Sequence, residues 1–126
     1  MNSKFLVPFE TAKMLKKAGY PQSGSDMYYN PNSELKTQVE LIAGYKEDYP
    51  TMIKYYIAAP AYCEVLDWLV GKKICITCRP AYSYEGQYNG FQYEMQTYDE
   101  DDYPDDIYRT REEALNAGIL AALEML

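Results

Sequence analysis

The chain of 126 residues contains no histidine, the side chain most often used as a general base at neutral pH. This absence excludes every catalytic triad or dyad that depends on a histidine. The sequence also lacks a glycine-rich phosphate loop and a Gly-x-Ser-x-Gly turn around a nucleophilic serine. We therefore predict no catalytic residue and expect no cofactor, so that a non-enzymatic role is favoured over an enzymatic one.

Positive charge is scarce, because 12 Lys and Arg residues face 19 Asp and Glu residues and give a net charge of −7. This balance argues against direct binding to nucleic acid or to anionic lipid, since both require clustered cations. No apolar run approaches the ~20 residues that a membrane-spanning helix needs. The first residues also lack the pattern of a secretory signal. We expect a cytoplasmic protein without a membrane partner.

Only three cysteines are present, an odd number without the spacing of a disulfide framework. Reduced thiols in the cytoplasm are the simplest interpretation. Cys75 and Cys78 have a Cys-x-x-Cys spacing, but they fall in a predicted strand, where residues three apart point to opposite faces. A zinc site would need four ligands gathered at one point. We interpret both residues as structural and predict no metal site.

Aromatic residues are strongly biased, with 15 tyrosines against 3 phenylalanines and 1 tryptophan. Six of the nine positions 98–106 are acids, and five tyrosines lie before or within this stretch, namely Tyr82, Tyr84, Tyr88, Tyr98 and Tyr103. Tyrosine is enriched where proteins bind each other, although the same rings could simply cover a thin sheet. For the acids, a solvated loop is favoured over a calcium site built from Asp99, Asp101 and Asp105, because the spacing of a calcium-binding loop is missing.

Local patterns predict the elements of the first half of the chain. A helix over residues 8–18 should start at Pro8 and stop at Gly19, with Phe9, Ala12, Met14, Leu15 and Ala18 on its apolar side. A short strand is expected over 26–29 and another over 52–57, while 35–49 suits a helix and a strand equally.

The stretch from Ala59 to Arg79 predicts a helix that opens at Pro60 and ends at Gly71, followed by a strand over 74–79 that Pro80 terminates. Trp68 lies at the edge of the helix's apolar arc, so we expect it to be half-buried. Ile74, Ile76 and Cys78 should point to one side of the strand, and Cys75, Thr77 and Arg79 to the other.

The last third of the chain predicts a long hairpin loop over 81–90, a half-buried strand over 91–97, a solvated loop over 98–106 and a short strand over 107–109. Thr110 and Glu113 have the spacing of a capping box at the start of a helix. The apolar face of that helix should consist of Leu115, Ile119, Ala122, Leu123 and Leu126.

These elements predict an α+β fold within a single domain over residues 1–126. We expect a small two-layer sandwich, in which about three helices pack on a mostly antiparallel sheet of three to four strands.

Three short segments carry a resemblance. They are Leu15–Tyr20, the pair Ala59–Tyr62 and Leu66–Leu69, and Thr110–Leu115, one in each predicted helix. In this order and approximate spacing they resemble small uncharacterised proteins of Bacteroides-type phages, prophages and mobile elements. The resemblance implies a small cytoplasmic accessory protein from a gut bacterium or its phage, and it brings no site residues with it.

The functional hypothesis is a non-enzymatic accessory or protein-interaction module with a protein partner. One alternative is a small carboxylate-based metal-binding protein or hydrolase, and another is a homo-oligomer formed through a strand edge or the C-terminal helix. The predicted interaction surface combines tyrosine and acid, and consists of Tyr82, Tyr84, Tyr88, Tyr98, Asp99, Glu100, Asp101, Asp102 and Tyr103.

Overall fold

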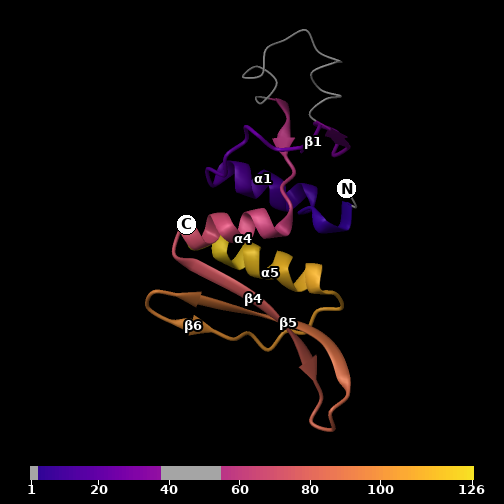
Figure 1. Ribbon diagram of the computed structural model, residues 1–126, viewed down its shortest axis with the longest axis vertical. Helices are drawn as coiled ribbons and strands as arrows, with labels where there is room; N and C mark the ends of the chain where they lie inside the picture. Colours follow the sequence, from indigo (N-terminus) through magenta and orange to yellow (C-terminus); the bar gives the residue numbers. More distant parts are fainter. Residues whose placement is uncertain (1–2, 38–54) are drawn as a thin grey trace. The chain divides into compact units, whose positions relative to one another are not determined.

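The computed structural model describes residues 3–37 and 55–126. These residues form three α-helices and two three-stranded antiparallel sheets, which is an α+β fold (Figure 1). The predicted fold class and antiparallel pairing are therefore confirmed. The described strands are divided between two sheets, where the sequence predicted a single sheet, because β1 pairs with β2 and β3, whereas β5 pairs with β4 and β6. The chain also divides into two compact units, Met1–Ala61 and Tyr62–Leu126, and the single domain stays a prediction.

In its described residues, the first unit contains one α-helix, a short 3-10 helix and a small sheet of order β2-β1-β3. The helix begins after Pro8, and Gly19 at φ +98° follows its end, as predicted. Met14 is 41% exposed, and its predicted place on the buried side was wrong, because Thr11 is buried there instead. The elements are η1 (Ser3–Phe5), α1 (Phe9–Lys17), β1 (Met27–Tyr29), β2 (Leu35–Thr37) and β3 (Ile57–Ala58).

Tyr29 ties the elements of this unit together. Its hydroxyl donates a buried hydrogen bond of 2.7 Å to the carbonyl oxygen of Val7, and its ring meets that of Phe9 edge-on at 5.4 Å. Burial raises the pKa of this phenol, because the charged form would lose its hydration.

The predicted strand at 26–29 is confirmed as β1. Most of the ambiguous segment 35–49 lies outside the described residues, and its described start is strand β2. Half of the predicted strand 52–57 also lies outside them, and of its other half only Ile57 belongs to a strand.

The second unit consists of two helices and a sheet of order β4-β5-β6. Helix α5 packs along β4 and β5, and α4 packs against α5 and β4 (Figure 1). The predicted alternation along β4 is confirmed, because Ile74 and Ile76 are buried whereas Thr77 and Arg79 are exposed. The elements are α4 (Tyr62–Gly71), β4 (Ile74–Tyr82), β5 (Tyr88–Thr97), β6 (Asp101–Asp102) and α5 (Arg111–Leu123).

Helix α4 ends at Gly71 as predicted, and Trp68 is half-buried on it, with the Lys72 ammonium 5.4 Å from its ring centroid. The left-handed residue that turns the chain into β4 is Lys73, at φ +67°, and not a glycine. A side chain at such a φ costs roughly 1 kcal/mol relative to glycine.

The β4–β5 hairpin is longer than predicted, because Pro80 does not end β4. Pro80 pairs with Phe91, whose N–H and C=O groups both bond to Tyr108, at 2.8 and 2.7 Å. Phe91 therefore directs its backbone groups away from β4, and the missing N–H of Pro80 removes no bond from the ladder. The predicted hairpin loop 81–90 shortens accordingly to residues 83–87.

The predicted solvated loop 98–106 is partly wrong as well. Asp101 and Asp102 form strand β6, which pairs with Met95 and Gln96 of β5. The turn between the strands is closed by a 2.9 Å bond from the Thr97 N–H to the Glu100 carbonyl oxygen. Both aspartates remain exposed on this edge strand. The predicted strand at 107–109 is confirmed only as the single bridge between Tyr108 and Phe91.

Helix α5 begins at the predicted cap, where the Thr110 hydroxyl accepts a 3.1 Å hydrogen bond from the Glu113 N–H. The return bond from the Glu113 side chain stays a prediction. At the middle of the helix, a Cβ on Gly118 would lie 2.9 Å from a methyl carbon of Ile76 and 3.1 Å from the ring of Tyr93. This glycine therefore lets the helix approach the sheet closely.

The apolar face of α5 is only partly as predicted. Leu126 lies beyond the end of the helix and is 52% exposed, so its predicted place on the buried face was wrong. Leu115 is half-buried. The buried residues of the helix are Ala114, Gly118, Ile119, Ala122 and Leu123.

Candidate functional site

The predicted tyrosine and acid surface is divided between the two ends of strand β5 (Figure 1). Residues 82–88, the hairpin tip, carry Tyr82, Tyr84 and Tyr88 at its start. Residues 97–103, the acidic end, carry Tyr98, the four acids and Tyr103 at its finish. A strand of this length spans roughly 30 Å, so the two groups cannot form one continuous contact patch.

At the hairpin tip the three tyrosines are exposed, but two of them are engaged with each other. The rings of Tyr82 and Tyr88 meet edge-on at 6.3 Å, and Tyr88 meets Phe91 in the same way at 5.7 Å. Only the side chain of Tyr84 stands fully in solvent. Such edge-to-face pairs contribute about 0.5–1.5 kcal/mol each, so this group of rings stabilises the hairpin itself.

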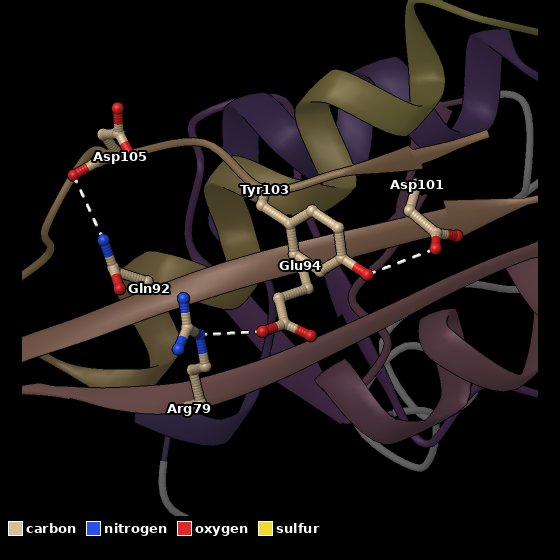
Figure 2. Close-up of polar contacts among 6 residues, drawn as sticks. All are labelled: Arg79, Gln92, Glu94, Asp101, Tyr103 and Asp105. Carbon is tan, nitrogen blue, oxygen red and sulfur yellow. Dashed lines mark hydrogen bonds and ion pairs between the residues drawn. The ribbon is translucent and has the colours of Figure 1, made fainter.

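At the acidic end, the hydroxyl of Tyr103 donates a 3.2 Å hydrogen bond to a carboxylate oxygen of Asp101 (Figure 2). This bond and the charge of Asp101 raise the pKa of the phenol, because ionisation would place two negative charges side by side. Tyr98 is 91% exposed, beside the run of acids. The predicted residues of this half of the surface therefore do lie together.

The face of the sheet opposite α5 carries a set of polar contacts that sequence reasoning missed (Figure 2). Arg79 forms an ion pair of 2.8 Å with Glu94, and the side chain of Gln92 donates a 3.2 Å bond to the Asp105 carbonyl oxygen. The alternation of the strands placed Arg79 and Glu94 on the wet side. Their pairing depends on the register between β4 and β5, which no local pattern specifies.

A groove of about 580 Å³ lies between the acidic end and the C-terminal end of α5. We call it the acidic groove. Its apolar part contains the buried Met95 and the half-exposed Met125, and its polar part is dominated by carboxylates. The contribution of α5 was missed, because nothing in the sequence relates residues 121–125 to β6. The lining residues are Met95, Thr97, Glu100, Asp101, Asp102, Ala121, Glu124 and Met125.

The electrostatics of the acidic groove are one-sided. Glu124 is the C-cap of α5, where the helix dipole is already negative, and the last turn contains no basic residue. Among residues 3–37 and 55–126, no Lys or Arg forms an ion pair with any of the four lining carboxylates. Burial raises the pKa of the neighbouring Tyr93, and the charges of Asp102 and Glu124 add to this effect. Within the part of the chain that the structure describes, the groove therefore presents negative charge without a paired cation.

The cysteines contribute no cluster to this region. Cys75 and Cys78 lie on opposite faces of β4, as predicted, but Cys75 is exposed and is not a core residue. Burial raises the pKa of the Cys78 thiol, against an opposing effect of Arg111. In the part of the chain that the structure describes, no three His, Cys, Asp or Glu side chains are arranged to hold a metal ion.

No helix among the described residues is long and apolar enough to cross a membrane. No protein family, no curated protein and no solved structure matches this chain. The groove and its charges are therefore the basis for a functional proposal.

Proposed function

We propose that this protein is a non-enzymatic accessory module that binds a basic surface of another protein through its acidic end. The observation that supports the proposal is the acidic groove, whose four acidic lining residues form no ion pair with a Lys or Arg among the described residues. Clustered negative charge of this kind steers and selects a positively charged partner. Tyr98, 91% exposed beside the acids, adds aromatic area of the type found in protein interfaces.

The hairpin tip is the weaker candidate for the same role. Two of its three rings already pack against each other and against Phe91, so their contacts within the hairpin account for their positions. At the acidic end the hydrogen bond from Tyr103 engages the carboxylate of Asp101, but the acids form no ion pair with a Lys or Arg among the described residues and repel one another. This difference favours the acidic end as the binding surface.

The cellular setting belongs to the same proposal. Three free thiols fit a reducing cytoplasm, and an accessory protein of a phage or mobile element is the origin that the sequence resemblance implies. The homo-oligomer stays a prediction. The carboxylate-based metal-binding or hydrolase alternative also stays a prediction, and no arrangement among the described residues favours it.

A pull-down with two matched triple variants tests the proposal. Glu100→Gln, Asp101→Asn and Asp102→Asn neutralise the acidic end, whereas Tyr82→Ser, Tyr84→Ser and Tyr88→Ser remove the rings of the hairpin tip. We expect the wild type and the tyrosine variant to capture the same basic proteins, with capture weakened by salt, and the acidic variant to lose them. Equal capture by a folded acidic variant would overturn the proposal.

A further inference from the structure

The acidic groove combines two kinds of surface that suit different parts of one ligand. Met95, Ala121 and Met125 form an apolar part, and the carboxylates of Asp102 and Glu124 belong to the polar part. The volume of about 580 Å³ lies within the range of sites that hold whole chemical groups, and it is far larger than a single ion requires. Methionine side chains adapt readily to varied aliphatic partners.

The charge at the end of α5 adds a reason for a cation to bind. Glu124 adds its negative charge to the negative pole of the helix, and Asp102 from β6 lines the same groove. A positive charge placed between Glu124 and Asp102 would offset the repulsion between Glu124 and the helix pole, and also the repulsion between the two carboxylates. The thioether chains beside this position would at the same time cover an aliphatic stem.

We propose that the acidic groove receives one long basic side chain, a lysine or an arginine, from an extended segment of the partner protein. Its aliphatic stem lies against Met95 and Met125, and its charged head lies between Asp102 and Glu124, because the carboxylate of Asp101 is turned towards Tyr103 on the opposite face of the sheet (Figure 2). Long basic side chains divide their surface in this way wherever apolar and acidic groups adjoin. The inference rests on the proposed function and specifies the chemistry of the partner.

Other occupants fit the groove less well. The described carboxylates are not arranged as the ligands of a metal ion. A second copy of this chain carries the same net charge of −7, so its surface would on average be repelled by the groove. A basic segment of another protein is the occupant for which both the charge and the apolar part of the groove are complementary.

Two synthetic peptides separate insertion of a stem from simple attraction of charge. One is an acetylated six-residue lysine peptide, and the other contains 2,4-diaminobutyrate in place of lysine, which keeps the charge and removes two methylene groups from every side chain. At mildly acidic pH, where both peptides are fully charged, calorimetry with the full chain should show the lysine peptide binding about three- to tenfold more tightly, because the removed methylenes would be partly buried.

Three variants give the matched controls. Glu124→Gln should weaken binding of the lysine peptide about two- to fivefold, as expected for a partly exposed charge pair, whereas Glu85→Gln at the hairpin tip makes the same change in net charge and should have no such effect. Met125→Ser alters a residue that is 51% exposed and lies beyond the helix, so the fold should be retained. This variant should remove most of the preference for the longer stem.

The outcomes distinguish the two levels of the proposal. Equal binding of both peptides, with Glu85→Gln as harmful as Glu124→Gln, would overturn the groove inference and leave the acidic interaction module standing. Full displacement of the lysine peptide by millimolar calcium, at constant ionic strength, would also overturn it. If neither peptide binds while the pull-down partners still depend on the acids of residues 100–102, the inserted side chain is wrong but the proposed function is not. Loss of both effects would overturn both.

Discussion

The two ends of strand β5 both carry exposed tyrosines, but the interactions of their side chains differ. At the hairpin tip, the exposed rings of Tyr82 and Tyr88 satisfy each other and Phe91. At the acidic end, acidic residues lie near the negative pole of α5, and none of them forms an ion pair with a Lys or Arg among the described residues. Exposure is common to both ends. The ends differ in whether their exposed side chains have partners within the described residues. A surface whose charges lack such partners is the better indicator of a binding partner.

Helix α5 packs along β5 and contributes more to the acidic groove at one end of the strand than to the hairpin tip at the other. Near its start, the Arg111 guanidinium lies 5.5 Å from the centroid of the Phe91 ring. At its middle, Gly118 approaches Tyr93, and at its end Glu124 lines the acidic groove. The groove therefore depends on the placement of α5, whereas the hairpin tip is formed by β4 and β5 alone. Changes in the helix should separate the two regions.

The largest effect is expected from Gly118→Ala. The new methyl group would lie within 3 Å of a side-chain methyl of Ile76, so either that side chain or the helix must shift. Overpacking typically costs about 1–3 kcal/mol, and the better helix propensity of alanine returns about 1 kcal/mol of this. We expect a net loss of up to about 2 kcal/mol in urea unfolding followed by Trp68 fluorescence, together with weaker binding of the lysine peptide.

Gly71→Ala is the matched control for that substitution, because a Cβ at the end of α4 meets no atom within 4 Å. It should leave the free energy of unfolding unchanged or slightly higher. If the two alanine variants were equally stable, the close approach of α5 to the sheet would be refuted.

A smaller effect is expected from Thr110→Ala, which removes the oxygen that accepts from the Glu113 N–H. Loss of such a cap costs about 1 kcal/mol of stability, and Thr110→Ser should restore most of it. Because the cap lies at the opposite end of α5 from Glu124, affinity for the lysine peptide should not change under native conditions. A parallel loss of peptide affinity would show that the groove is not localised at the helix C-terminus.

The smallest effect concerns the titration of Tyr103. Its hydrogen bond to Asp101 and the charge of that residue raise the pKa of the phenol, so the neutral form persists to higher pH than in a free tyrosine. Asp101→Asn should lower this pKa towards the ordinary value of about 10. The difference in ultraviolet absorbance between each protein and its Tyr103→Phe counterpart would measure the pKa of Tyr103. An unchanged pKa would show that the hydrogen bond to Asp101 does not form in solution.

Structural features that depend on a few neighbouring residues could be predicted from the sequence. Pro8 and Gly19 delimit α1, Thr110 caps α5, and the alternation along β4 separates buried from exposed side chains. Each of these depends on residues within one or two turns or on the two-residue period of a strand. The α+β class follows from such local signals alone.

The rest depends on contacts between distant residues. Pro80 could continue β4 only because Phe91 bonds to Tyr108, which the sequence around Pro80 does not reveal. The acids of β6 meet Glu124 only through the packing of α5 on the sheet. Neighbouring tyrosines and acids suggested one surface, but the length of β5 separates them, since a strand extends by about 3.3 Å per residue.

The most direct test of the central claim is a titration of the isotopically labelled protein with the lysine peptide, followed residue by residue through amide chemical shifts. We predict that the amides of residues 97–103 and 121–126 shift with the peptide, that salt reverses the shifts, and that residues 82–88 remain unaffected. Shifts confined to residues 82–88, or spread evenly over the acids of the whole chain, would contradict the assignment of the binding surface to the acidic end.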